Sequence, residues 1–503
     1  MKRLLLIPFL FSLLSLLPFS CTDLEVPNDN AINTKKVSAD LNDIINIAES
    51  SFRTFHNTIQ EYISLALPLA VMADHLTMSW GTTRDYSCEP RDSQRNSYPN
   101  TKMYAYSFQL IGQWEGAYSA IDKANLVLSC MDLESDFNLE DNQKALLEAF
   151  SYFVSGVSHG YLGLIFDKAI VIKHTDDLTN PVLSSWEVVI DEALKFLDKA
   201  IEIADANSFE IPLNWVGGLE MTNIELAQLA NAYSARILMS SSRTKAHNRE
   251  IDWDKVREYA QNGPRWDFTP IIGDAYGWSD DYWVYGRYPG WARADMRIIN
   301  LMDHDYPSRW PRDNISWNTP DGNDPGEADP DDARLTTDFE YLETNSFRPE
   351  RGYYHFSHYR HSRYDYLSNE AWYGNGAKPS FLAWEVRLIE AEALFRTGSF
   401  DGALAILNDP TGPRKLRGQL PDVQATDDVL RYILDEKEIE CFLTGAGISY
   451  FDMRRTDRLQ PATLLHFPVP ASELEIMRFE HYTIRWHANG TDGSYGDWTG
   501  WDE

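Results

Sequence analysis

Apolar side chains recur every three or four residues along most of this chain, which is the spacing of one face of an α-helix. Between residues 144 and 166 the apolar positions are Leu146, Phe150, Phe153, Val157, Tyr161 and Leu164. The same period recurs over residues 186–204, 223–239 and 382–395, and Ser184 or Ser185 stands where a cap of the first of these helices belongs. The pattern predicts a mainly α-helical protein.

The predicted helices form pairs. Residues 382–395 are followed by the turn Thr397-Gly398-Ser399-Phe400 and a shorter helical run, which is the pattern of a tetratricopeptide-like unit. Looser pairs join residues 114–129 to 144–166 and residues 223–239 to 253–260. Because one pair cannot bury its own apolar face, we expect the pairs to stack into a curved scaffold over about residues 40–263 and 379–445.

The helical period disappears between residues 264 and 378, where aromatic residues gather instead. Six of the sixteen tryptophans fall between Trp266 and Trp317, where an even spread would place about two. A second irregular segment covers residues 74–101. Long irregular segments in compact proteins are more often functional than accidental, although about half of these aromatics are expected to fill the core. The binding candidates taken from the two segments are Trp80, Trp278, Tyr282, Trp283 and Trp291.

Composition narrows the ligand class. The 503 residues include 76 acidic and 45 basic side chains, which give a formal net charge of -31. Such a charge repels phosphate backbones and anionic lipid surfaces, so we expect neither nucleic acid nor a membrane face to be bound electrostatically. Aromatic faces suit the C–H faces of pyranose rings. We therefore expect a glycan ligand, and a neutral one.

The N-terminus has the features of a secretion signal. Lys2 and Arg3 precede an apolar stretch from Leu4 to Phe19 that is too short to span a bilayer. Residues 1–20 therefore form a predicted signal peptide, and Cys21 directly after it is the predicted lipid anchor of a bacterial lipoprotein. The remaining cysteines, Cys88, Cys130 and Cys441, lack metal-ligand spacing, and the last two are expected to be buried thiols.

Catalytic motifs are weak. Gly156-Val157-Ser158-His159-Gly160 matches the G-x-S-x-G nucleophile elbow, but it lies inside a predicted helix, where close packing of small residues explains it. The acidic pair Asp280 and Asp281 falls in the aromatic segment, yet nothing singles out an acid and a base for glycoside hydrolysis. The sequence therefore predicts a protein that is not an enzyme.

Metal motifs are also weak. His355, His358 and His361 are spaced by three, but the aromatic and basic residues around them favour a strand or loop, where they would not share a side. The run from Asp321 to Asp332 resembles a calcium loop, although Pro325 occupies a ligand position. No cofactor or metal is predicted, and calcium in an acidic loop stays an open alternative.

Several elements together resemble the SusD/RagB family of outer-membrane nutrient-binding lipoproteins from Bacteroidetes. The C-terminal part, residues 436–480, carries the most specific ones. In chain order the matching elements are Trp114-x-x-x-Tyr118-x-x-Ile121-x-x-x-Asn125, Ala391-Glu392-Ala393, Glu436-Lys437 with Glu440, Tyr450-Phe451-Asp452-Met453-Arg454-Arg455, and Phe467-Pro468-Val469-Pro470 with Glu473-Leu474. Leu382 and Trp384 depart from the usual family pattern, as does Thr444-Gly445-Ala446-Gly447, which suggests a divergent branch.

The resemblance implies one tetratricopeptide-like domain over residues 21–503, with its ligand region at about 264–378. It also implies a lipid anchor in the outer membrane, exposure at the cell surface, and a partner in a SusC-like TonB-dependent transporter to which captured glycan is delivered. The family motifs are scaffold, so they assign no binding residue.

Two other functions compete with glycan capture. Within the family, RagB-like members capture peptides. Outside it, a helical-toroid glycoside hydrolase would need two carboxylates at a fixed separation in an aromatic cleft. Release of reducing sugar would separate the hydrolase from both binding proteins.

Overall fold

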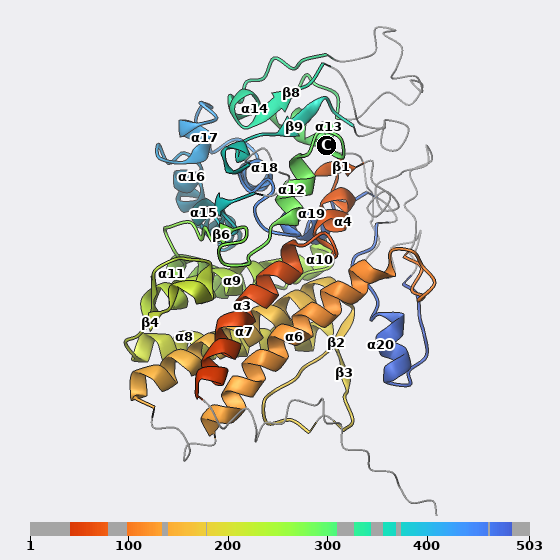
Figure 1. Cartoon of the computed structure of the whole chain (residues 1–503). Coiled ribbons are helices and arrows are strands. Elements are labelled where there is room, and N and C mark those ends of the chain that lie inside the picture. The colour runs from red at the N-terminus through yellow and green to blue at the C-terminus, as the bar shows by residue number, and fades with distance from the viewer. Residues whose placement is uncertain are drawn as a thin grey trace, which may run out of the picture.

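The computed structural model describes residues 41–78, 98–132, 139–177, 179–308, 326–343, 356–368, 374–460 and 463–484. Helices dominate these ranges (Figure 1). The longer helices are α3 (Leu41–Gln60), α6 (Ser107–Asp132), α7 (Asp141–Ile165), α8 (Trp186–Ala206), α9 (Asn223–Ser240), α11 (Trp253–Asn262), α15 (Ala383–Arg396) and α18 (Val429–Glu440). The shorter helices are α4 (Ala66–Met72), α10 (Lys245–Asn248), α12 (Asp281–Arg287), α13 (Met296–Met302), α14 (Arg334–Thr337), α16 (Phe400–Leu407), α17 (Pro413–Leu416), α19 (Ile448–Arg455) and α20 (Ala471–Ile476), with 3-10 turns η1 (Leu213–Val216) and η3 (Asp365–Leu367).

The prediction of a mainly α-helical protein with paired helices is confirmed. Helix α6 packs on α7, α7 on α8 and α8 on α9, and the series continues through α11 and α15 to α16 (Figure 1). Residue types at the helix ends explain where the helices begin. Thr222 caps α9 through a reciprocal exchange with Glu225, whose backbone N–H lies 3.3 Å from the Thr222 hydroxyl.

Close helix packing explains the glycine-rich motif in α7. A Cβ atom added at Gly156 would lie 2.5 Å from Cγ of Leu197, and one at Gly160 would lie 2.4 Å from Cδ1 of Ile237. Helices α8 and α9 therefore approach α7 where glycine leaves room. Ser158 is buried in the middle of α7, so the motif is a packing device and not a nucleophile elbow.

Residues 264–378 contain only short elements within their described part. The strands of the described chain form five antiparallel two-stranded sheets, β1–β7, β10–β6, β2–β3, β4–β5 and β8–β9. Their bounds are β1 (Leu76–Met78), β2 (Lys168–Ile170), β3 (Leu183–Ser185), β4 (Glu210–Ile211), β5 (Met221–Thr222), β6 (Ile271–Ile272), β7 (Ala292–Ala294), β8 (Phe339–Tyr341), β9 (Tyr359–His361) and β10 (Gly376–Ala377). Pairing of β1 with β7 joins the irregular region to the N-terminal helices.

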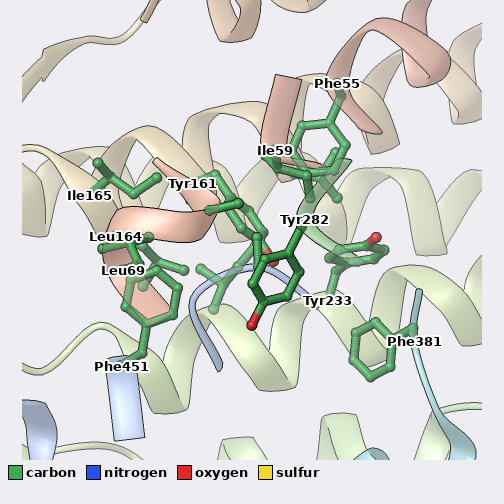
Figure 2. Close-up of a cluster of buried hydrophobic side chains, with 14 of the residues drawn as sticks. Phe55, Ile59, Leu69, Tyr161, Leu164, Ile165, Tyr233, Tyr282, Phe381 and Phe451 are labelled. Atoms are coloured by element: carbon green, nitrogen blue, oxygen red, sulfur yellow. The ribbon is translucent and has the colours of Figure 1, made fainter. Parts of the chain in front are cut away.

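Aromatic side chains fill the centre of the core. Figure 2 shows Phe55 from α3, Tyr161 from α7 and Tyr233 from α9 converging with Phe381 and Tyr282. The rings of Phe55 and Tyr161 meet edge to face at 5.3 Å, and those of Tyr233 and Phe381 at 5.2 Å. Cys130 and Cys441 are buried, as predicted, and burial raises the pKa of both thiols.

Buried arginine–carboxylate pairs connect the C-terminal helices to the helical pairs. Arg455 of α19 donates two hydrogen bonds to Glu392 of α15, at 2.6 and 2.5 Å. Arg236 of α9 donates two to Glu385, at 2.7 and 2.6 Å. Further buried pairs are Arg297–Glu438, Arg334–Glu436, Lys437–Asp452 and Lys378–Asp280. Each pair joins two segments, so the charges are satisfied only in the complete fold.

Arg454 acts in the same way without a carboxylate. Its guanidinium donates to the backbone carbonyls of Leu164, Ser240 and Leu465, each at 2.8 Å. The ends of α7 and α9 are thereby fixed to the C-terminal segment. The charged and aromatic residues of the late sequence motif are thus structural.

Replacing Glu392 with Gln is expected to lower the free energy of unfolding by about 3 kcal/mol, because the buried Arg455 would lose one of its two carboxylates and would keep only Asp452, which it shares with Lys437. Chemical denaturation at pH 7 measures this loss. Glu202→Gln is the matched control, since its ion pair with Lys199 is exposed and is expected to contribute less than about 1 kcal/mol.

The stability lost in Glu392→Gln should depend on pH. Burial opposes ionisation of Glu392, but attraction to Arg455 outweighs it and lowers the pKa from 4.5 to about 2. A lowered pKa stabilises the fold above the unfolded value and loses that effect as the pH falls through the folded one. The stability difference between wild type and Glu392→Gln should shrink between pH 4.5 and 2; a constant difference would contradict the pairing.

Candidate ligand-binding site

The structure corrects three of the five predicted binding residues. Trp278, Tyr282 and Trp283 are 1%, 3% and 0% exposed, so their ring faces are covered by other side chains. Tyr282 points into the aromatic core in Figure 2. The Trp278 ring packs edge to face on Phe52 at 5.5 Å, and the Arg287 guanidinium lies 4.5 Å from the Trp283 ring centre. These three side chains belong to the core and cannot stack on a sugar.

The other two predicted binding residues are Trp80 and Trp291. Trp80 lies outside the described residues, two positions after Met78, the last residue of β1. Trp291 is half-buried and packs against the edge of the core. It directly precedes β7, whose Ala292 pairs with Met78. Trp291 is therefore the one predicted aromatic that the described structure places at the surface.

Trp291 belongs to a row of four aromatic rings, which we call the aromatic ladder: Tyr62, Tyr285, Trp291 and Tyr288. Trp291 stacks on Tyr285 with ring centres 4.8 Å apart and planes at 14°. Tyr288 lies 4.7 Å from Trp291 on a tilted plane, and Tyr62 lies 5.6 Å from Tyr285. Tyr62 is 36% exposed and the other three are half-buried. A row of tilted and stacked rings at a surface can bind flat apolar faces.

Local backbone structure positions the ladder. Tyr285 lies in the last turn of α12, and Tyr288 and Trp291 lie in the turn that follows. The Tyr288 carbonyl accepts hydrogen bonds from the N–H groups of Trp291 and Ala292, both at 3.0 Å. Tyr62 comes from the turn between α3 and α4, far away in the sequence. The period of three from Tyr285 to Trp291 is a sequence signal, whereas Tyr62 has none.

Asp280 and Asp281 hold the helix that carries the ladder, and they do so differently. Asp280 caps α12 by accepting from the Trp283 N–H at 2.9 Å, and its other oxygen pairs with the buried Lys378 at 2.6 Å. Asp281 accepts from the Tyr62 backbone N–H at 3.2 Å across 219 residues of sequence. Asp280 is structural, and only Asp281 lies beside the ladder.

Polar groups gather next to Asp281 at the Tyr62 end of the ladder. Glu61 accepts from the Ser279 hydroxyl at 3.0 Å, and Asn57 accepts from the Ser279 backbone N–H at 3.0 Å. Burial raises the pKa of Asp281 to about 6, and the negative charges of Glu61 and Asp280 add to this effect. Carboxylate and amide oxygens at the edge of an aromatic row are acceptors of the kind that sugar hydroxyls need.

The proposed metal motifs do not converge in the described structure. His361 is buried in β9, and His358 just before it lies 2.9 Å from the Leu342 carbonyl, so this segment is the strand that the sequence favoured. His355 and residues 321–325 lie outside the described ranges. Asp332, the last acid of the calcium-like run, binds Arg334 at 2.7 Å. Within the described residues, no three His, Cys, Asp or Glu side chains come together in a way that could hold a metal ion.

The anchor residue Cys21, the leader and Cys88 also lie outside the described ranges, so these predictions remain predictions. Among the helices that the structure describes, none combines the length and the apolar character needed to cross a bilayer.

Comparison with known proteins identifies the fold. No protein-family profile and no curated protein matches the chain. Solved structures do match, at low sequence identity. A SusD superfamily protein from Parabacteroides distasonis superposes with a TM-score of 0.59 at 12% identity, covering 89% of this chain and 98% of the other. The chain therefore has a SusD-like fold, as its sequence motifs indicated.

Two other matches are carbohydrate-related. A SusD-like carbohydrate-binding protein from Bacteroides fragilis gives a TM-score of 0.55 at 14% identity, covering 84% of this chain and 87% of that one. A structure described with a xylogluco-oligosaccharide gives 0.53 at 14% identity, with coverages of 86% and 85%.

Replacing Asp281 with Asn is expected to stabilise the protein at pH 7. The folded pKa of about 6 exceeds the unfolded value of 3.8, so the native state holds the proton between these values and gains stability as the pH falls. Above pH 6 the ionised carboxylate costs stability. A pKa difference of this size corresponds to about 3 kcal/mol, and partial exposure reduces the expected gain to about 1 to 2 kcal/mol.

Thermal or chemical unfolding of both proteins at pH 7 and pH 4 measures this effect. The two should differ at pH 7 and converge near pH 4, where Asp281 is protonated and resembles Asn. Equal stability at both pH values would show that the Asp281 carboxylate is solvated and has an ordinary pKa.

Proposed function

We propose that this protein is a non-catalytic member of the SusD/RagB family that binds oligosaccharides or polysaccharides. The aromatic ladder carries this proposal, since it places stacked rings and hydrogen-bond acceptors at the surface of a SusD-like fold. Carbohydrate binding by two proteins of the same fold supports it. The acidity of the chain favours neutral sugars over acidic ones.

The finer parts of the proposal rest on the sequence. The predicted signal peptide and Cys21 support a lipid anchor in the outer membrane with the protein at the cell surface. The same resemblance supports delivery of the glycan to a SusC-like TonB-dependent transporter. Labelling cells with an azide-bearing palmitate tests the anchor, because Cys21→Ala should lose the label while a Cys88→Ala control keeps it.

Replacing Trp291 with Ala is expected to weaken glycan binding about fivefold, because one stacking contact contributes about 1 kcal/mol. Isothermal titration of the soluble chain, starting at Thr22, against a panel of neutral and acidic polysaccharides measures this loss. Trp291→Phe should retain most of the affinity, since it keeps a flat ring.

Trp384→Ala is the matched control. Trp384 is also half-buried, but it lies at the start of α15, near Gly412, and packs on a different hydrophobic cluster from Trp291, so its loss should leave binding unchanged. Equal losses in the two Ala variants would indicate general destabilisation and would contradict a site at the ladder.

The alternatives have distinct outcomes in the same titration. Binding of a peptide pool, with no response to any glycan, would assign a RagB-like peptide-capturing role. Release of reducing sugar that is lost in Asp281→Asn would favour a glycoside hydrolase, because Asp281 is the ladder carboxylate with a raised pKa. Binding that disappears with a calcium chelator would reveal a metal requirement.

A further inference from the structure

A second surface, which lies along α6 and is separate from the aromatic ladder, has the features of a docking site. An open cavity of about 560 Å³ lies along α6, between the first half of α3, the strand β2 and the C-terminal helix α20. Its apolar lining comes from Ile47, Trp114, Tyr118, Leu126, Ile170 and Ile172. The cavity is therefore a mainly apolar groove built from well-separated parts of the chain.

The wall of this groove is held in place by hydrogen bonds and ring contacts. The Tyr118 hydroxyl donates to the Ile170 carbonyl at 2.9 Å and accepts from the Ile170 N–H at 2.6 Å. The Trp114 ring packs edge to face on Phe166 at 5.0 Å. These contacts hold Tyr118 against β2 and Trp114 against the residue that follows α7, so both rings are already in place before a ligand binds.

Three carboxylates, Glu115, Asp122 and Glu473, line the groove. Within the described part of the chain, none of the three forms an ion pair, in contrast to the paired carboxylates of the core. The basic residue of the wall, Lys123, is directed to α3, where its ammonium donates to the Thr54 hydroxyl at 2.6 Å. Burial, reinforced by Glu115, raises the pKa of Glu473. The groove therefore carries an excess of negative charge, which would favour binding of a cationic group.

Exposed apolar side chains continue the surface beyond the groove. Met103, Ile476 and Phe479 are 90%, 75% and 44% exposed. An ion pair between Lys102 and Glu475 holds the segments that carry them against each other. Large apolar side chains that gather at a surface in this way mark an interaction site more often than chance exposure.

Two sequence elements that glycan binding does not use meet at this groove. Trp114 and Tyr118 belong to one, and Glu473 belongs to the element Phe467-Pro468-Val469-Pro470 with Glu473-Leu474. They lie more than 350 residues apart in the chain, yet their side chains line the same cavity.

We propose that this groove and the neighbouring side chains of Met103, Ile476 and Phe479 form a docking surface for a second protein, bound through a segment in which arginine or lysine is flanked by apolar residues. The carboxylates would receive the basic side chain and the groove its apolar neighbours. A second copy of this chain is disfavoured, because two surfaces of a protein with a net charge of -31 repel each other. The proposal does not depend on glycan binding at the ladder.

The test uses the full chain from Thr22 and two synthetic hexapeptides with blocked ends. One contains leucine and phenylalanine alternating with arginine, and the other has glutamate in place of each arginine. Isothermal titration at low salt should detect the basic peptide and not the acidic one. The affinity should fall at least tenfold in the triple variant Glu115→Gln, Asp122→Asn, Glu473→Gln, and it should weaken with added salt.

A control variant removes the same number of charges elsewhere. Three exposed acidic residues of α8 serve for this purpose: Glu187, Asp191 and Asp205. The triple variant Glu187→Gln, Asp191→Asn, Asp205→Asn should bind the basic peptide like wild type. An equal loss of affinity for the basic peptide in both triple variants would show that only the net charge of the protein matters, and it would overturn the proposal. Glycan titration of the groove variant should be unchanged, which separates a failure here from a failure of the proposed function.

Other occupants give other results, and each would overturn the proposal. Equal affinity for the acidic peptide would show that the groove is merely apolar. A free tripeptide of leucine, arginine and phenylalanine that binds as tightly as the blocked hexapeptide would assign the groove to a captured nutrient. Self-association in sedimentation, or binding to phosphatidylethanolamine vesicles, that is lost in Met103→Ser with Ile476→Ser would assign it to a second copy or a lipid surface.

Discussion

Pairing of buried arginines with carboxylates is the interaction on which the rest of this structure depends. Arg236, Arg334 and Arg455 lie in an interior that excludes water, and each is stabilised there by a carboxylate, whereas Arg454 is stabilised by three backbone carbonyls. Helical stacking alone would allow neighbouring pairs to slide, because apolar contacts are not directional. Bidentate ion pairs fix α9 and α19 to α15, and α14 to α18, in one arrangement. Apolar packing thus holds the helices together, and the ion pairs determine how the helices are arranged.

Charge pairing also supports the candidate ligand site. Lys378 pairs with Asp280 in the interior, and Asp280 in turn caps α12, the helix from which Tyr285 projects. The ladder therefore rests on a buried charge pair, and its rings are held at defined spacings without contacts to a ligand. The apolar groove on α6 differs, because none of its three carboxylates forms an ion pair within the described residues. Paired charges stabilise the core, whereas the groove carboxylates are the ones proposed to bind a partner.

Helical periodicity predicted the scaffold well, because burial of one face leaves a record at every third or fourth residue. Helices α7, α8, α9 and α15 begin and end within a few residues of the predicted ranges. Aromatic clustering predicted less well which aromatic side chains reach the surface. Trp283 and Tyr285 are two residues apart, yet α12 turns the first into the core and the second to the surface, and composition cannot distinguish them. Trp291 is a predicted residue that the structure places at the surface, whereas Tyr62 was not predicted because only the folded chain brings it to Tyr285.

The origin of Tyr62 has a consequence for the life of the molecule. Tyr62 is 219 residues away in the sequence from Asp281, whose carboxylate accepts from the Tyr62 backbone N–H. Helix α12 is in turn fixed by Lys378, which lies still further along the chain. Contacts of such long range form late, because closing a large loop costs entropy before any contact compensates it. A chain that is still being made, or one that has misfolded, therefore lacks the Tyr62 end of the ladder. Occupied ladders would then occur only on finished molecules, so ligand would stabilise complete copies and leave defective ones to proteolysis.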